Sequence, residues 1–149
     1  MEMVQLRGVT STVRDTNAEL GANAKLVLTE KLLTHGSQTA ISNMKVELKG
    51  EGSSVQVISR SVAQDDSVQV FNPLVIGECA CRGHVQCDAI IMGNAKVKAI
   101  PGIEAASEDA MLVHEAAIGK IAGDQIVKLM TLGLTEEEAE AEILDDFLS

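Results

Sequence analysis

Residues 67–100 read SVQVFNPLVIGECACRGHVQCDAIIMGNAKVKAI, and this stretch decides between the fold classes open to the chain. It contains short apolar runs separated by turn residues, at Val68–Val70, Leu74–Ile76, Ala89–Ile91 and Val97–Ile100. Similar runs precede it at Leu26–Leu28, Val46–Leu48 and Val55–Ile58. The spacing predicts a repeat of about 20 to 22 residues, built from two strands of roughly four to six residues and two turns.

Turn residues lie beside these apolar runs at a similar spacing. Gly50-Glu51-Gly52, Asn72-Pro73 and Gly93-Asn94 follow a run, whereas Asn43 and Asp65-Asp66 precede one. Such a repeat fits a β-meander or sandwich, whose strands pair antiparallel through hairpins. It also fits a solenoid, in which like strands of successive coils stack in parallel. The lack of Asn-Gly and Asp-Gly turns and of large aromatic side chains favours the solenoid, but the residues alone leave both folds open.

Composition narrows the possible partners. The chain has 149 residues, a formal net charge of −10 and 46% apolar residues, but its aromatic residues are Phe71 and Phe147 alone. The core must therefore be aliphatic, which suits the narrow interior of stacked sheets. The charge and the lack of stacking aromatics argue against nucleic acid and anionic membranes as partners. With no apolar leader and no spanning run, the sequence predicts a cytoplasmic protein with reduced cysteines.

The pattern becomes helical after Ile100-Pro101-Gly102. A first helix is expected to end at Gly133, and a second to begin at Thr135, whose spacing to Glu138 matches a capping box. Each helix carries an apolar stripe, formed by Ile126, Leu129 and Met130 in the first and by Ala139, Ile143, Leu144 and Phe147 in the second. Either the stripes pack on each other and on the last coil, or at least one face receives a partner.

The segments RGHVQCDAIIMGNAKVKAIPGIEA (82–105) and LVHEAAIGKIAGDQIVKLMTLGLTEEEAEAEILDDFL (112–148) together resemble the C-terminal half of the SufB/SufD family of iron–sulfur assembly scaffolds. The resemblance implies a mainly β fold, a right-handed parallel β-helix that is truncated here and followed by a small C-terminal α-helical segment. We therefore expect a partial β-helix over residues 1–105, with the last coil and the helical segment over residues 106–149. Family members are usually much longer, so earlier coils and an N-terminal helical region are expected to be missing.

The same resemblance implies where nascent cluster is handled. SufB-type chains carry a cysteine where this chain reads Gln86-Cys87-Asp88, and an acidic-His-Glu stretch where it reads Val113-His114-Glu115. Cys87, His114 and Glu115 are therefore expected to bind the metal of a transient iron–sulfur cluster. Val113 departs from the pattern and removes one expected oxygen ligand. The presence of both Cys87 and His114 makes the chain more similar to SufB than to SufD.

The resemblance also implies two partners. The family's C-terminal helices dock the SufC ATPase, which points to Ile126, Leu129, Met130, Ile143, Leu144 and Phe147. The chain has no GxxxxGK[ST] motif, so we expect it to bind no nucleotide itself. The second partner is another SufB/SufD-type chain, in a homo- or heterodimer. Family members work in pairs, and the first coil, around Leu6–Val13, shows no cap over its unpaired backbone groups. The interface could be this first coil or the last coils.

Cys79, Cys81, His84 and Cys87 also suit a zinc or iron–sulfur site by residue type, although their spacing is irregular for one. Alternatively, Cys79 and Cys81 share one face of a strand as small core residues.

Two rival functions are a carbohydrate-active β-helix enzyme and an inert interaction module. The first would need exposed aromatics and catalytic carboxylates. The predicted function is a non-enzymatic scaffold of SUF-type assembly that holds nascent cluster and docks a SufC-like ATPase.

Overall fold

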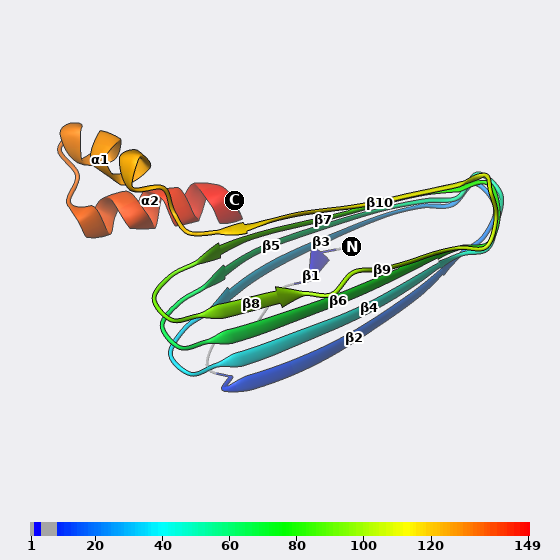
Figure 1. Cartoon of the computed structure of the whole chain (residues 1–149), viewed down its shortest axis with the longest axis horizontal. Coiled ribbons are helices and arrows are strands. Elements are labelled where there is room, and N and C mark those ends of the chain that lie inside the picture. The colour runs from blue at the N-terminus through cyan, green and yellow to red at the C-terminus, as the bar shows by residue number, and fades with distance from the viewer. Residues whose placement is uncertain (1, 4–8) are drawn as a thin grey trace.

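The computed structural model describes residues 2–3 and 9–149, and these residues form ten strands followed by two helices (Figure 1). The strands are β1 (Glu2–Met3), β2 (Ser11–Leu20), β3 (Lys25–Thr34), β4 (Thr39–Leu48), β5 (Ser54–Ala63), β6 (Val68–Gly77), β7 (Cys81–Ile91), β8 (Lys96–Ala99), β9 (Gly102–Ala105) and β10 (Ala110–Gly119). The helices are α1 (Gly123–Thr131) and α2 (Glu136–Leu148). Strands β1, β3, β5, β7 and β10 form sheet A, and β2, β4 and β6, with β8 and β9 both on β6, form sheet B.

Successive coils stack so that equivalent positions lie above one another. Val57 of β5 pairs in parallel with Leu28 of β3 on one side and with Val85 of β7 on the other, so these two coils take 29 and 28 residues. The chain alternates between the two sheets, and the pairings within both are parallel. The fold is a parallel β-solenoid of about four turns with two C-terminal helices, which confirms the predicted β-helix.

The predicted repeat of about 20 to 22 residues is wrong, because most strands are ten residues long. A strand of that length contains two apolar runs, and both Val68–Val70 and Leu74–Ile76 belong to β6. Runs that lie one predicted repeat apart also fall in different sheets, since Leu26–Leu28 lies in β3 and Val46–Leu48 in β4. Counting each apolar run as a separate strand therefore made the coil too short.

The predicted turns are confirmed at Gly50–Gly52, Asp65-Asp66 and Gly93-Asn94. The turns predicted at Asn43 and Asn72-Pro73 are wrong, because these residues lie inside strands β4 and β6. The two asparagines instead belong to a ladder on the outer face of sheet B. Nδ2 of Asn72 donates to Oδ1 of Asn43, and Nδ2 of Asn43 donates to Oδ1 of Asp15, each over 2.8 Å. Stacking in register lets side-chain amides bond to each other instead of to their own backbone.

The turns at the solenoid end remote from the helices stack as closely as the strands do. Gly52 has a φ of +72°, and its N–H donates to the carbonyl of Ala80 in the next coil over 2.8 Å. A Cβ on Gly50 would lie 1.9 Å from the backbone nitrogen of Ala22 in the previous coil. Glycine is therefore required at Gly50, and the stacked turns fix the position of the β6–β7 turn.

The interior between the sheets is aliphatic, with a polar region near its middle. Leu28, Leu48 and Val57 are fully buried, and burying such side chains stabilises the fold by about 1.5–3 kcal/mol each. The polar region includes the carboxylate of Glu30, which is 2% exposed. Its Oε2 accepts a hydrogen bond from Oγ of Ser42 over 2.8 Å and lies 3.3 Å from Nη1 of Arg14. These partners offset the desolvation of the buried charge.

The two helices lie at the end of the solenoid where β10 stops (Figure 1). The predicted capping box is confirmed, because Oγ1 of Thr135 accepts from the N–H of Glu138 and the Glu138 carboxylate accepts from the N–H of Thr135. Gly133 follows α1 with a φ of +100°, as predicted for a helix stop. Helix α1 contacts α2, and α2 contacts β5. Within the part of the chain that the structure describes, no helix is long and apolar enough to cross a bilayer.

Each sheet of the described solenoid has two edges, formed by β1 and β10 in sheet A and by β2 and the β8–β9 pair in sheet B, and two of these strands bear on the predicted interface. Strand β10 is the last strand of sheet A, and β2 is the first strand of sheet B. The first coil predicted to lack a cap, Leu6–Val13, includes residues 6–8, which lie outside the described residues. Val13 is described, and it is 61% exposed on β2. An edge strand presents unpaired N–H and C=O groups, so both edges are places where another chain could pair.

Candidate functional site

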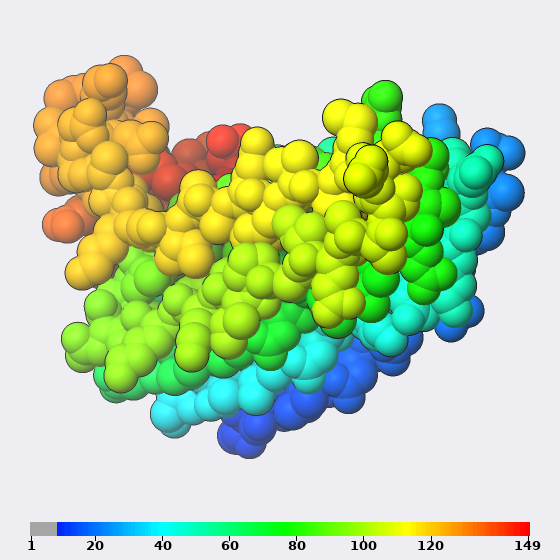
Figure 2. Space-filling view, turned by 45° about the vertical axis from the view of Figure 1, so that its right-hand side comes forward, coloured from blue at the N-terminus to red at the C-terminus, as the bar shows by residue number. Residues whose placement is uncertain are grey.

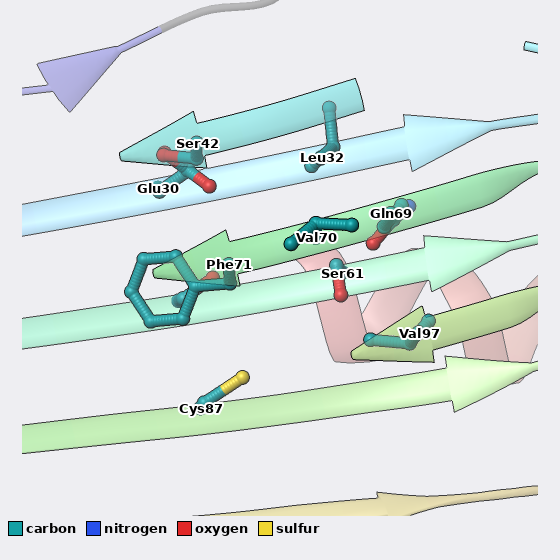
Figure 3. Close-up of a pocket in the computed structure, with 10 residues that line it drawn as sticks. Glu30, Leu32, Ser42, Ser61, Gln69, Val70, Phe71, Cys87 and Val97 are labelled. Atoms are coloured by element: carbon teal, nitrogen blue, oxygen red, sulfur yellow. The ribbon is translucent and has the colours of Figure 1, made fainter. Parts of the chain in front are cut away.

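Cys87 lies in the middle of β7 and points into the solenoid (Figure 3). The alternation of the strand buries Cys81, Val85 and Ala89 on the same face. In the register of sheet A, Cys87 stands between Ser59 of β5 and Ala116 of β10. Its side chain is 1% exposed, so solvent does not reach the thiol directly.

A small cavity of about 10 Å³ lies beside Cys87 inside the solenoid (Figure 3). Its lining combines polar and apolar side chains: Glu30, Leu32, Ser42, Ser59, Ser61, Gln69, Val70, Phe71, Cys87 and Val97. A space of this size holds about one water molecule. The interior beside Cys87 therefore has no room for an iron–sulfur cluster while the coils keep this arrangement.

Burial raises the pKa of the Cys87 thiol to about 11, and the carboxylates of Asp88 and Glu30 add to the shift. The thiol is therefore neutral at pH 7. Because the thiolate is the form that binds metal, a metal at Cys87 must displace the thiol proton.

His114 lies on β10, two residues before the position that pairs with Cys87. The alternation that packs Leu112 into the core also turns His114 inward. Its Nε2 atom is buried and has no hydrogen-bond partner among the described residues. Burial lowers the pKa of His114, and the nearby His84 adds to this effect, so its imidazole is neutral at pH 7. Neutral imidazole is the form that ligates metals. The structure thus brings Cys87 and His114 to neighbouring strands on one interior face.

Glu115 points in the opposite direction. It lies on the outer face of sheet A with its side chain 64% exposed, and its Oε2 is 3.2 Å from Nε2 of His84 on β7. Successive side chains of a strand point to opposite faces, so His114 and Glu115 do not converge on one ion in this conformation. The structure therefore joins two of the three residues that the resemblance implied, and places the third beside His84.

The described residues contain no group of three or more His, Cys, Asp or Glu side chains arranged to hold a metal ion. A single metal site made of Cys79, Cys81, His84 and Cys87 is therefore wrong. His84 and Cys87 lie on opposite faces of β7, because three residues separate them along a strand of period two. The core interpretation fits Cys81, which is 4% exposed and packs in the hydrophobic core.

Sequence reasoning missed Glu30, which lines the same cavity as Cys87. A signal for it was present. Leu26, Leu28 and Leu32 occupy alternate positions of one strand, and Glu30 fills the remaining position of that inward row. A carboxylate in an inward-facing row is uncommon, and it indicates a buried polar interaction with a partner side chain.

The helical tail places the residues predicted to dock an ATPase in two environments. Met130 is 44% exposed, whereas the others are half-buried: Ile126, Leu129, Ile143, Leu144 and Phe147. Two further apolar side chains of this region, Val127 and Leu132, are 59% and 77% exposed. The space-filling view shows the tail projecting beyond the strands (Figure 2). A shallow groove on α2 is lined by Leu134, Glu138, Ala141, Glu142 and Asp145.

The chain is a β-solenoid protein with a buried thiol site and a helical tail. Its coils stack in parallel, an inward cysteine and an inward histidine lie on neighbouring strands, and two helices project from one end. A family model described as "SUF system FeS cluster assembly, SufBD core domain" matches residues 2–147. The chain belongs to the SufBD family, which confirms the resemblance read from its sequence.

Relatives show the same family at moderate identity. An iron-sulfur cluster assembly SufBD family protein of Methanothermobacter thermautotrophicus is 33% identical over 133 residues, which are 87% of this chain and 32% of the relative. A SufBD family protein of Pyrococcus horikoshii is 36% identical over 124 residues, which are 82% of this chain and 38% of the relative. The chain therefore spans about a third of the length of the curated relatives it matches.

Proposed function

We propose that this chain is a scaffold component of iron–sulfur cluster assembly, in which Cys87 and His114 hold nascent cluster and the helical tail docks a SufC-like ATPase. The observation that carries the proposal is that a buried thiol and a buried imidazole nitrogen, which has no hydrogen-bond partner among the described residues, lie on one interior face, the imidazole on the edge strand β10 itself. Thiolate sulfur and imidazole nitrogen are ligands that suit iron. Membership of the SufBD family supports an assembly role rather than carbohydrate chemistry.

Two ligands do not complete a cluster site, because a cluster of this kind takes about four ligands. We infer that a second SufB/SufD-type chain, identical or different, pairs along β10 and supplies the others. The cavity beside Cys87 holds about one water molecule, so the proposal includes a separation of β10 from β7 that admits the cluster. Strand β10 has a free edge, and its outer face carries Met111 and Val113, which are 63% and 49% exposed. Glu115 projects from that same outer face, so its proposed ligand role belongs to a site shared with the partner.

The tail has the features of a docking surface for a protein with basic residues. Its apolar side chains Val127, Met130 and Leu132 are exposed, and the groove on α2 carries three carboxylates. A partner with an apolar pocket rimmed by lysine or arginine would complement both. We therefore propose that residues 106–149 work as the docking unit, and that nucleotide is bound by the partner.

Anaerobic reconstitution with ferrous iron and sulfide tests the cluster site. Cys87→Ala and His114→Ala are expected to lower iron content and cluster absorbance, whereas the matched variant Cys79→Ala is expected to load like the parent. The paired complex is measured beside the isolated chain, since the partner is proposed to complete the site. Equal loading of Cys87→Ala and Cys79→Ala in the complex would contradict the assignment.

A further inference from the structure

His84 and Glu115 lie beside each other on the outer face of sheet A, on the neighbouring strands β7 and β10. Nε2 of His84 is 3.2 Å from Oε2 of Glu115, and the two side chains are 36% and 64% exposed. Both side chains are therefore in contact with solvent. An imidazole nitrogen and a carboxylate oxygen are two of the donors that bind zinc in proteins.

The separation of these two atoms fits a shared metal ion as well as a hydrogen bond. Zinc binds imidazole nitrogen and carboxylate oxygen at about 2.0–2.2 Å, so two donors at tetrahedral or octahedral angles lie about 3.0–3.4 Å apart. A bound ion lies to one side of the line that joins the two donor atoms. Rotation of the two exposed side chains is therefore enough to bind it, and the register between β7 and β10 stays as it is.

Gln86 offers a third donor on the same face. It follows His84 by two residues on β7 and pairs in register with Glu115. Its Nε2 donates to Oδ2 of Asp88 over 2.7 Å. An ionised carboxylate only accepts hydrogen bonds, so Asp88 fixes which end of the amide faces it and leaves Oε1 as an acceptor. This Oε1 accepts no hydrogen bond from the residues that the structure describes.

We propose that His84, Glu115 and Gln86 bind one zinc ion on the outer face of sheet A, with water completing the coordination. Only two of the three are His, Cys, Asp or Glu, so the site differs in kind from the groups of three that the described residues lack. Zinc binds a given set of nitrogen and oxygen ligands more tightly than ferrous iron does, which favours zinc as the occupant. The net charge of −10 also favours a cation. Because β10 is the last strand of sheet A in the described solenoid, water can reach the ion from its free side.

The zinc site is separate from the interior site proposed for nascent cluster. Cys87 and His114 face the interior, whereas His84 and Gln86 face outward, and Glu115 alone belongs to both proposals. An ion held by β7 and β10 together opposes the separation of these strands, which the proposed loading of cluster requires. This consequence rests on the proposed function, but the zinc site itself does not.

Calorimetric titration of the full chain with zinc chloride at about pH 8 tests the proposal. The parent is expected to bind one ion, and His84→Ala and Glu115→Gln to bind it at least about tenfold more weakly. Gln86→Leu should weaken binding about threefold, because an amide oxygen suits zinc less well than imidazole does. His84→Gln should also lose at least about tenfold, although glutamine can still donate a hydrogen bond to Glu115. The controls Cys87→Ala and His35→Ala, which remove a buried thiol and an exposed histidine elsewhere, are expected to bind zinc as the parent does.

A measurement on the parent chain avoids any dependence on how a variant folds. Of the three histidines, His84 is expected to show the zinc-dependent shift of imidazole resonances in the NMR spectrum. Four outcomes would overturn the proposal: no zinc binding by the parent, a shift at His35 in place of His84, full affinity in His84→Gln, or loss of affinity in Cys87→Ala. Neither experiment measures cluster loading, so failure of the proposed function would leave the result on zinc unchanged.

Discussion

Nε2 of His84 lies 3.2 Å from Oε2 of Glu115 on the outer face of sheet A, while the next residue on β10, His114, faces the interior. We predict that Glu115→Gln leaves iron loading of the isolated chain close to that of the parent, whereas His114→Ala lowers it. The pair is exposed, so its loss should cost less than about 1 kcal/mol of stability. Equal loss of iron in both variants would show that Glu115 turns inward when metal binds.

Helix α1 supplies a test of docking that leaves the fold intact. Val127→Asp or Met130→Asp is expected to weaken binding to a SufC-like ATPase at least about tenfold, because exposed apolar side chains at the centre of an interface contribute most of its affinity. Calorimetric titration measures the change. Gln125→Asp, an exposed substitution on the same helix, is the matched control. Unchanged affinity in the Val127 and Met130 variants would place the ATPase elsewhere on the chain.

The raised pKa of Cys87 predicts a pH dependence of stability. A group whose pKa is higher in the folded state contributes stability that is fully present below its unfolded value and is lost as the pH rises through the folded value. Between the ordinary thiol pKa of 9.0 and the folded value of about 11, the free energy of unfolding should therefore fall. The loss should reach on the order of 2–3 kcal/mol and be absent in Cys87→Ala. Urea unfolding of both proteins from pH 8 to 11 measures it, and parallel curves would contradict it.

The buried carboxylate of Glu30 predicts a large loss of stability when its ion-pair partner Arg14 is replaced. Arg14→Ala leaves this charge with Ser42 alone, and should destabilise the fold by about 2–4 kcal/mol, since removal of one partner exposes the desolvation cost of the other. Arg82→Ala removes an exposed arginine and should change stability by less than about 0.5 kcal/mol. Chemical unfolding of the two variants at one pH compares them, and similar values would mean that the buried charge has other compensation.

The open edge of β10 predicts association. Sedimentation equilibrium at micromolar concentration is expected to give a mass of at least twice 15.7 kDa. Val113→Lys is expected to shift the mass toward the monomer, because lysine on an edge strand opposes pairing. Leu33→Lys, on the distant strand β3, serves as the control with similar exposure. A monomer mass for the parent across this range contradicts pairing of identical chains and leaves a different SufB/SufD-type partner as the proposed one.

The class of fold and the ends of the helices could be predicted from the sequence, but the length of a coil could not. Thr135 and Glu138 cap α2 through contacts three residues apart, which spacing reveals directly. The length of a coil depends on which apolar run pairs with which, and Asn72 looks like a turn residue until Asn43 lies beside it. Strand alternation alone could have separated His114 from Glu115. The exposure of Val127 could not be read, because it depends on how the tail packs at the solenoid end.

Leu28, Val57 and Val85 stand in one inward row, although 29 residues separate the first two and 28 the last two. Side chains alternate along a strand, so spacings of 29 and of 28 residues can keep the same positions inward only if a turn takes up the additional residue. A single-residue insertion within a strand would instead exchange inward and outward positions as far as the next turn, so an insertion in β7 before Cys87 would turn its thiol to the outer face. Changes of length are therefore expected to be tolerated in the turns or as whole coils, and not inside the strands.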